Sequence, residues 1–405
     1  MPPTVLALSN ALGYPNYRRR LNELQRLNFE VSHCGFDDNS GFGALDSSLE
    51  EVRLGDIQPG RYMKRFAAIL SAVRGLQRLL SVKQPNVLWV FGVDMIPLVL
   101  IARSLNRMMF WSVWRSSRNE RALLAAKFPP KFVYEVHDIR DLMLSPTPVG
   151  WLLRFLERQL LTKETLVIVT SSQYLDNYFE KFHSDRSFPT LVLENKLTAR
   201  EVYVVRSSSR ANKAMRNDEG GVGTIRIGYF GSLRCPYAWR AVLTLADHRS
   251  GQFEVLVRGV PRGLDRFEED LVDHPRVHYG GPYSDPANLA ELYGAVDIVW
   301  VAGFHGKQSH LWARTCRFYY ACCFGVPLIG QIDTFDASEI ERLGVGFSID
   351  LSALDVQQQL VKMLTRSNIE RWRKQSQGLP ESVYSFSQDH DGLLPHLATL
   401  LDGVG

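Results

Sequence analysis

The repeated alternation of short apolar runs with segments of helical periodicity constrains the fold of this chain more than any other feature. The runs TVLALS (4–9), VLWVFG (87–92) and TLVIVTSS (165–172) are strand-length, and each is followed by a segment with apolar residues at helical spacing. Strands that alternate with helices in this way form βαβ units, in which a parallel sheet carries helices on both faces. We therefore predict an α/β fold.

The alternation stops at one polar stretch and then starts again. Residues 206–223 contain no apolar run, and a new strand-like run, IRIGYFG, follows at 225–231. We predict two doubly wound Rossmann-like domains that face each other across a cleft, with ligands beyond the carboxyl ends of the strands. The predicted divisions are an N-terminal domain at 1–205, a linker at 206–223, a C-terminal domain at 224–380 and a tail at 381–405 that could return to the N-terminal domain.

Composition narrows the class of protein. Of the 405 residues, 45% are hydrophobic and 22% are charged, which matches ordinary globular proteins and excludes disordered or collagen-like chains. The five cysteines form no C-x-x-C pair, so we expect neither a metal cluster nor a disulfide framework. The start MPPTVLALSN lacks the basic region of a signal peptide, and we predict a cytoplasmic location.

Positive charge is concentrated in one part of the chain. Residues 61–131 hold 13 basic residues against two acidic ones, Asp94 and Glu120, and they begin with a basic amphipathic helix at 61–82. A membrane surface is the favoured interpretation, because arginines meet anionic headgroups while aromatic and aliphatic side chains enter the interface. A solvated basic face is the alternative, and no recognised motif supports nucleic acid. The candidates for membrane contact are Arg61, Lys64, Arg65, Arg74 and Arg78.

Two motifs in the second domain indicate a ligand site. Gly231 directly follows a strand, so a ligand could approach the backbone closely, and Arg234 is placed to pair with phosphate oxygens. This is not the G-x-G-x-x-G loop of dinucleotide cofactors. Further on, Arg317, Tyr319 and Tyr320 stand at the start of a predicted helix, where the helix dipole favours anions. The simpler alternatives are a glycine turn and a plain helix–turn–strand.

Polar residues also follow strands of the first domain. His137 and Asp138 end the run KFVYEVHD, Asp94 follows VLWVFG, and Gly13 lies in the loop after the first strand. Strand-end placement would point these residues toward the ligand side of the sheet. The structural alternatives are helix caps, a histidine packed under a loop and an ordinary βα turn.

The second domain resembles the nucleotide-sugar-binding domain of GT-B glycosyltransferases. The similarity is to the large retaining family and, within it, to the succinoglycan-type branch of exopolysaccharide assembly. It rests on residues 227–236, 278–301 and 309–330, and it covers the N-terminal domain only in the order of strands and helices. The last stretch typically reads N-S-x-W-L-L-P-N-R-x-Y-E-x-x-x-F-G-x-P-x-I in that branch. This chain keeps the pattern at Ser309, Trp312, Arg317, Tyr319, Phe324, Gly325, Pro327 and Ile329.

The resemblance implies a metal-independent glycosyltransferase with a nucleotide-diphosphate sugar, first of all a UDP-sugar, as donor substrate and with no resident cofactor. The family's glutamate, which accepts hydrogen bonds from the ribose, is replaced by Tyr320, whose phenol is uncharged near pH 7. The donor site implied consists of Gly231 and Arg234 at the diphosphate, Arg317 and Trp312 beside them, and Tyr319 and Tyr320 at ribose or sugar hydroxyls.

In the N-terminal domain the resemblance implies the acceptor site. Asp138, His137 or Asp94 would act as the catalytic or positioning group, and Gly13 would lie on the acceptor-side loop. A glycan or lipid-linked saccharide is the acceptor implied, which predicts peripheral association with the inner face of the cytoplasmic membrane.

Two other functions stay open. A nucleotide-sugar epimerase on the same fold would need acid–base carboxylates and histidines in the cleft. A degenerate, non-catalytic glycosyltransferase-like scaffold would explain the missing glutamate. No metal site is expected, because the histidines lack H-E-x-x-H spacing and we expect no acidic D-x-D triplet of the kind that metal-dependent sugar transferases carry.

Overall fold

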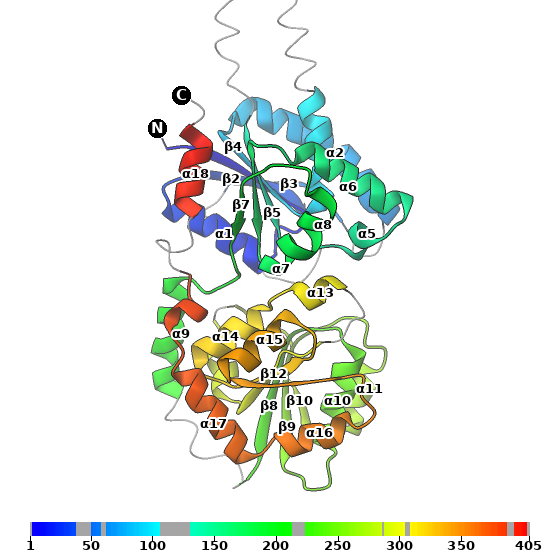
Figure 1. Cartoon of the computed structure of the whole chain (residues 1–405), viewed down its shortest axis with the longest axis vertical. Coiled ribbons are helices and arrows are strands. Elements are labelled where there is room, and N and C mark those ends of the chain that lie inside the picture. Colours follow the sequence, from blue (N-terminus) through cyan, green and yellow to red (C-terminus); the bar gives the residue numbers. More distant parts are fainter. Residues whose placement is uncertain are drawn as a thin grey trace, which may run out of the picture. The chain divides into compact units, whose positions relative to one another are not determined.

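The computed structural model describes residues 2–37, 50–57, 62–105, 130–212, 223–285, 287–303, 308–386 and 393–402. These residues form two compact units, one of Met1–Leu193 with Gly392–Gly405 and the other of Glu194–Asp391 (Figure 1). Each unit is an α/β structure with its own sheet, so each is described by itself.

The first unit contains a seven-stranded parallel sheet in the order β3-β2-β1-β4-β5-β6-β7. The strand order reverses between β1 and β4, and this switch point is where ligands bind in open α/β sheets. The strands are β1 (Thr4–Ser9), β2 (Glu30–Asp37), β3 (Glu50–Asp56), β4 (Val87–Phe91), β5 (Lys131–Val136), β6 (Thr165–Val169) and β7 (Thr190–Val192).

Helices cover both faces of this sheet, as expected for right-handed crossovers whose direction reverses at the switch point. Figure 1 shows α2 and α6 on one side of the sheet and α1 on the other. The helical elements are α1 (Pro15–Arg26), α2 (Tyr62–Lys83), η1 (Val93–Met95), α5 (Asp141–Leu144), α6 (Pro148–Leu160), α7 (Ser172–Tyr174), η2 (Leu175–Phe179), α8 (Glu180–His183) and α18 (Leu393–Asp402), with a further helix at 96–105.

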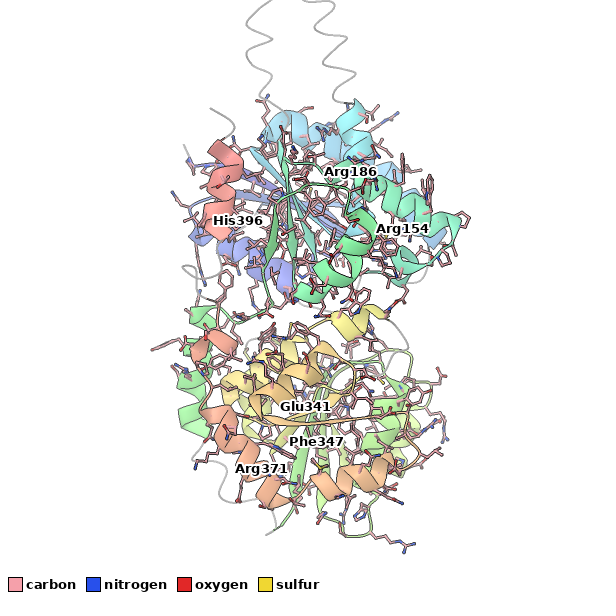
Figure 2. The ribbon with its side chains drawn as sticks, in the orientation of Figure 1. Arg154, Arg186, Glu341, Phe347, Arg371 and His396 are labelled. Atoms are coloured by element: carbon pink, nitrogen blue, oxygen red, sulfur yellow. The ribbon has the colours of Figure 1, made fainter. Side chains whose placement is uncertain are left out.

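Local sequence explains where α6 begins and how its entry is held. Thr147 caps the helix by accepting a hydrogen bond from the Gly150 amide at 3.2 Å, and Pro148 occupies the first helical position. Arg154, labelled in Figure 2, donates to the carbonyl oxygens of Met143 and Ser145, so it fixes the turn between α5 and α6. The orientation of α6 is therefore set by its own first turns.

The second unit contains a six-stranded parallel sheet in the order β10-β9-β8-β11-β12-β13. Its switch point lies between β8 and β11. The strands are β8 (Ile225–Leu233), β9 (Phe253–Pro261), β10 (Val277–Tyr279), β11 (Ile298–Trp300), β12 (Leu328–Gln331) and β13 (Gly346–Ile349).

The helices of the second unit follow the predicted alternation closely. They are α9 (Ala199–Asn212), α10 (Pro236–Ala246), α11 (Phe267–Asp273), α12 (Leu289–Gly294), α13 (Gln308–Trp312), α14 (Cys316–Phe324), α15 (Phe335–Leu343), α16 (Val356–Met363), α17 (Arg366–Gln377) and η4 (Glu381–Val383).

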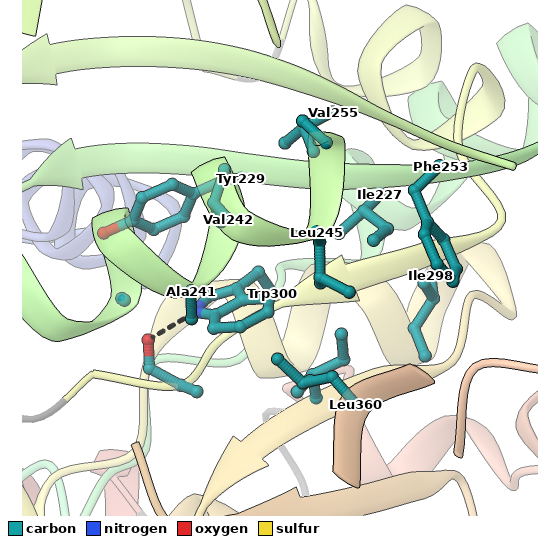
Figure 3. Packing of buried hydrophobic residues seen from close by; sticks show 14 of the residues in the cluster. Ile227, Tyr229, Ala241, Val242, Leu245, Phe253, Val255, Ile298, Trp300 and Leu360 are labelled. Atoms are coloured by element: carbon teal, nitrogen blue, oxygen red, sulfur yellow. Dashed lines mark hydrogen bonds between the residues drawn. The ribbon is translucent and has the colours of Figure 1, made fainter. Parts of the chain in front are cut away.

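The core of the second unit explains its stability. Ile227 and Val255 from β8 and β9 pack with Leu245 of α10, and Trp300 of β11 donates its indole N–H to the Ala302 carbonyl at 3.0 Å (Figure 3). A buried indole N–H without an acceptor would be costly, so this bond lets a large aromatic ring fill the centre of the core.

The boundary between the units differs from the predicted linker. The second unit begins at Glu194, and residues up to Asn212 form α9, so the first part of the expected linker, 206–212, is helical. The reason is that Val202 and Val205 of α9 are buried in the core of the second unit. Residues 213–222 lie outside the described part of the chain. The C-terminal helix α18 groups with the first unit.

Candidate functional site

Arg317 occupies the switch point of the second sheet. It lies in the first turn of α14, and its Nη1 donates to the carbonyl oxygens of Phe230 at 3.3 Å and Trp300 at 3.4 Å. These carbonyls belong to β8 and β11, the two strands between which the order reverses. A half-buried cation is thereby fixed at the carboxyl edge of the sheet, where α/β proteins bind ligands.

Two glycines, Gly231 and Gly259, leave this part of the sheet edge without side chains. Gly231 has a φ of +103°, which side chains rarely adopt, and Gly259 pairs with it from β9 at a φ of +140°. A Cβ atom on Gly259 would collide with the Gly231 carbonyl oxygen, so this position must remain glycine. At Gly231 the nearest atom to an added Cβ is the Tyr283 hydroxyl at 3.9 Å, so the strand end is open.

A carboxylate that the sequence analysis did not single out stands beside Tyr320. The Tyr320 hydroxyl donates to Oδ2 of Asp285, in the segment after β10. The position that resembles the family's glutamate is therefore paired with a carboxylate from another loop. Burial and then Asp285 raise the pKa of the neighbouring Tyr283. Asp285 could have been found from sequence, because it follows the strand-like run at 276–281, as Asp94 follows its own strand.

Tyr319 does not face a ligand, contrary to prediction. Its side chain is fully buried, its ring meets Phe318 edge-to-face, and its hydroxyl has no hydrogen-bond partner among the described residues. Burial raises the pKa of this hydroxyl. Tyr320 is also buried, with only 3% of the residue exposed, and packs in the same core cluster as Tyr319. It differs from Tyr319 because its hydroxyl donates a hydrogen bond to Asp285.

The other residues predicted for the donor site lie in the same unit. Arg234 is exposed directly after β8, and Trp312 is half-buried at the end of α13. Arg314, by contrast, is buried: its Nη1 lies 3.0 Å from Glu194 Oε1, and its guanidinium lies 4.0 Å from the centre of the Phe335 ring. The positive charge of Arg314 is therefore balanced by Glu194 within the second unit.

In the first unit, Asp94 is the centre of a polar cluster. Its Oδ2 accepts hydrogen bonds from Asn10 Nδ2 at 2.8 Å and from Nη2 of both Arg65 and Arg140. Asn10 follows β1 and Asp94 follows β4, so the cluster lies at the switch point of the first sheet. The Asp94 carboxylate already pairs with two arginines. This fits an orienting role for Asp94 better than the predicted catalytic one.

The prediction that Arg65 contacts a membrane surface is therefore wrong. Only 13% of its side chain is exposed, because it turns toward Asp94. Lys64, Arg74 and Arg78 are exposed along the outward face of α2, as the prediction of a basic helix requires. Arg61 lies outside the described residues.

His137 belongs to a buried network around Glu135. Its Nε2 lies 3.1 Å from Glu135 Oε1, and its ring stacks on Phe91 at 5.6 Å. Glu135 is fully buried and accepts hydrogen bonds from Arg20 at 3.2 Å and from Trp89 Nε1 at 2.7 Å. These contacts anchor His137, the structural alternative raised from the sequence.

Asp138 and Gly13 stay at the positions predicted for them in the first unit. Asp138 is exposed at the carboxyl end of β5, on the same edge as the Asp94 cluster. Gly13 lies in the loop after β1 and is not among the glycines with a positive φ, so its conformation does not demand glycine.

Within the described residues, no group of three or more histidine, cysteine, aspartate or glutamate side chains could hold a metal ion. The expectation that the chain has no acidic D-x-D triplet was wrong, because Asp389–His390–Asp391 is one; it lies outside the described residues. In the part of the chain that the structure describes, no helix combines the length and the apolar character needed to cross a membrane.

Comparison with known proteins agrees with the resemblance seen in the sequence. No protein-family model matches the chain. The succinoglycan biosynthesis protein ExoL of Rhizobium meliloti (strain 1021) is 29% identical over 350 residues, which are 85% of this chain and 81% of that protein.

Two solved structures share the fold along nearly the whole chain. WaaG, a glycosyltransferase involved in lipopolysaccharide biosynthesis, has a TM-score of 0.65 at 14% identity and covers 99% of this chain and 100% of its own. Anabaena Alr3699/HepE in complex with UDP and glucose has a TM-score of 0.63 at 13% identity and covers 98% of this chain and 99% of its own. The predicted fold class and recognition are confirmed: this chain has the GT-B fold of glycosyltransferases and is similar in sequence to a succinoglycan biosynthesis protein.

Proposed function

We propose that this chain is a glycosyltransferase that moves a sugar from a UDP-sugar to a glycan or lipid-linked acceptor in exopolysaccharide assembly. The similarity to ExoL and the GT-B fold support this function, which is also the one predicted from the sequence. The observation that carries it is the Arg317 guanidinium, held by two strand-end carbonyls at the switch point of the second sheet.

The residues at this edge suit the chemistry of sugar transfer. Negative charge develops on the leaving diphosphate as the glycosidic bond breaks, and fixed cations stabilise that charge. Arg317 is fixed, Arg234 is exposed directly after β8, and Gly231 has no side chain that would obstruct phosphate oxygens. Asp285, paired with Tyr320, offers a carboxylate acceptor for ribose or sugar hydroxyls. We also propose that these two arginines stabilise the leaving diphosphate without a resident metal ion.

The other two functions make different demands. An epimerase would convert a nucleotide sugar without any acceptor, whereas a transferase releases free UDP only when an acceptor is present. A scaffold need not bind any nucleotide sugar. Measuring both donor binding and acceptor-dependent UDP release therefore separates the three.

Replacing Arg234 with alanine should weaken UDP binding. The loss of one charge-assisted contact to the diphosphate costs about 1.5–3 kcal/mol, or roughly 10- to 150-fold in dissociation constant. The fold should be unaffected, because Arg234 is exposed. Calorimetric titration with UDP measures the effect, and Arg240→Ala, an exposed arginine on the adjoining helix α10, is the matched control. Equal UDP affinity for wild type and Arg234→Ala would remove Arg234 from the site.

We also propose that the first unit binds an anionic membrane surface. The basic side chains Lys64, Arg74 and Arg78 lie along the outward face of α2. On α6, Trp151, Leu152 and Phe155 are 62%, 48% and 44% exposed, and the two aromatic rings stack at 5.5 Å. Phe155 follows Trp151 by four positions and Leu152 by three, so the three side chains form one outward apolar patch on a helix whose other side is buried.

A lipid interface fits both features. Exposed apolar patches mark interaction sites, and tryptophan is favoured at membrane interfaces. Each Lys or Arg near an anionic surface contributes about 1 kcal/mol, and this attraction is screened by salt. Because α2 and α6 cover the same side of the sheet, charge attraction and insertion could act on one membrane (Figure 1).

Vesicle co-sedimentation tests this membrane proposal. Wild type should sediment with vesicles rich in phosphatidylglycerol at low salt, far less with phosphatidylcholine vesicles, and should be released by high salt. The triple variant Lys64→Glu, Arg74→Glu, Arg78→Glu should lose binding, and Trp151→Ser with Phe155→Ser should weaken it. Charge reversal of Arg240, Lys362 and Arg371, all exposed on the second unit, is the control. Equal sedimentation with both kinds of vesicle, or with neither, would contradict the proposal.

A further inference from the structure

We propose that the hydroxyl of Tyr283 donates a hydrogen bond to the diphosphate of the nucleotide-sugar donor, in front of the Gly231 backbone and beside Arg317. The sequence analysis did not single out this tyrosine. That the ligand is a donor diphosphate rests on the proposed function, whereas the position of the hydroxyl rests on the structure alone.

Tyr283 borders the open end of β8. Its hydroxyl oxygen lies 3.9 Å from the place that a Cβ atom on Gly231 would take, and it is the nearest atom to that place. The space in front of Gly231 is therefore bordered by a hydrogen-bonding group rather than by a hydrocarbon surface. A phosphate group that approaches the Gly231 backbone would come within reach of this hydroxyl.

The loop that carries Tyr283 is fixed on both sides. Arg258 of β9 donates to the carbonyl oxygens of residues 281–282, in each case at 3.1 Å. Directly after the tyrosine, the Ser284 amide donates to Asn288 Oδ1 at 2.9 Å. The Tyr283 ring packs against the core of the second unit. The hydroxyl is therefore in position before a ligand arrives, which lowers the entropic cost of binding.

The charges around Tyr283 favour a hydrogen bond to an anion. Burial and then Asp285 raise the pKa of this hydroxyl, whereas Arg317 lowers it. The hydroxyl therefore keeps its proton at neutral pH, and the Arg317 guanidinium lies near enough to act on it. Hydrogen bonds to an ionised acceptor are roughly twice as strong as those between neutral groups. An oxygen of a diphosphate at this edge would be stabilised by the arginine and the hydroxyl together.

A second phenol indicates unused hydrogen-bonding capacity at the same place. Tyr293 is 1% exposed, and its hydroxyl has no hydrogen-bond partner among the described residues. Burial and then Tyr283 raise the pKa of Tyr293, and Arg317 lowers it, so the two phenols share one environment. Buried polar groups are nearly always paired, and an unpaired one calls for an explanation. A ligand oxygen that reaches this edge provides one.

The competing explanation is a tyrosine whose ring packs while its hydroxyl does nothing. Tyr283→Phe separates the two, because it keeps the ring and removes only the hydroxyl. Calorimetric titration should show UDP binding at least tenfold more weakly to this variant than to wild type, the loss expected for a hydrogen bond to a charged group. Uridine, which has no phosphate, should bind both proteins equally. Tyr203→Phe, at a tyrosine 73% exposed on α9, is the matched control.

The outcomes separate this inference from the proposed function. Equal UDP affinity of wild type and Tyr283→Phe would overturn the inference while the donor site stands. Equal weakening for UDP and uridine would place the hydroxyl at the nucleoside and overturn its assignment to the diphosphate.

Inorganic pyrophosphate, titrated without nucleotide, tests the anion contact by itself. It should bind wild type at least tenfold more tightly than Tyr283→Phe, and equal binding would contradict the contact. If wild type binds pyrophosphate in this way but does not bind UDP, the proposed donor fails and the contact of Tyr283 with a diphosphate is retained. Thermal unfolding without ligand should give the same midpoint for both proteins, because the ring that packs against the core is unchanged.

Discussion

Replacing Glu135 with alanine should lower the unfolding free energy of the first unit by about 3–5 kcal/mol, the usual cost of removing one partner of a buried ion pair. Glu135 is fully buried and holds Arg20, which is only 7% exposed, together with the indole N–H of Trp89. Without the carboxylate, Arg20 keeps Glu23 at 2.8 Å as its one acidic partner among the described residues, and Trp89 loses the acceptor of its indole N–H. Each orphaned group carries a desolvation penalty of its own.

Urea unfolding followed by tryptophan fluorescence would measure this loss as a lower transition midpoint for the first unit. Glu164→Ala is the control, because that glutamate lies in the same unit, is 74% exposed and pairs with Lys131 only at 3.8 Å. Exposed pairs of this kind contribute about 0–1 kcal/mol. An alanine variant at Glu135 as stable as wild type would show that the network does not hold the unit together.

The same carboxylate predicts how the stability of the first unit depends on pH. Burial alone would raise the pKa of Glu135, but Arg20 and His137 outweigh it and lower the pKa to about 2 from an ordinary value of 4.5. The unfolded chain therefore binds the proton more readily than the folded one. The stabilisation is present above pH 4.5 and is lost as the pH falls toward 2. Glu135→Gln should lose this part of the acid dependence.

Replacing Arg317 with alanine should lower the rate of sugar transfer by about 10²–10³-fold, the effect expected when one fixed donor to developing negative charge is removed. The guanidinium is held at the edge of β8 and β11 by the carbonyls of Phe230 and Trp300, so it needs no rearrangement when charge appears on the leaving diphosphate. Arg317→Lys should recover part of the rate, because it restores charge without the planar fork.

Transfer kinetics with saturating donor measure this effect, and circular dichroism checks the fold. Arg342→Ala is the matched control, since that arginine is exposed on α15 and pairs only with Glu339 among the described contacts. A full transfer rate in the Arg317 variant would place the leaving group elsewhere.

Most of the fold could be predicted because its strands are buried on both faces. Runs such as VLWVF and TLVIV are continuous and apolar, and the structure places strands β4 and β6 there. The edge strand β3, EEVRLGD, was missed because it pairs on one side only and can stay polar. The last part of α9, residues 206–212, was taken for linker because it is rich in serine and arginine, and the first part was assigned to the N-terminal domain although Val202 and Val205 are buried in the core of the second unit.

The candidate site was harder to predict because its contacts join distant parts of the chain. Strand-end placement correctly singled out Asp94, but its partners Arg65 and Arg140 are 29 and 46 positions away. Tyr320 was identified through the family pattern, whereas its partner Asp285 comes from another loop 35 positions earlier. Tyr319 was misjudged because a pattern match does not reveal which face of the helix is buried.

The most direct test of the central claim, a UDP-sugar site at the switch point of the second sheet, is a thermal-unfolding screen of the full chain with nucleoside diphosphates and nucleotide sugars. A ligand present at 100 times its dissociation constant stabilises the protein by about 2.7 kcal/mol. UDP and at least one UDP-sugar should raise the unfolding temperature of wild type, and Arg317→Ala should abolish most of the shift. No stabilisation by any nucleotide or nucleotide sugar would contradict the claim and favour a scaffold that binds no donor.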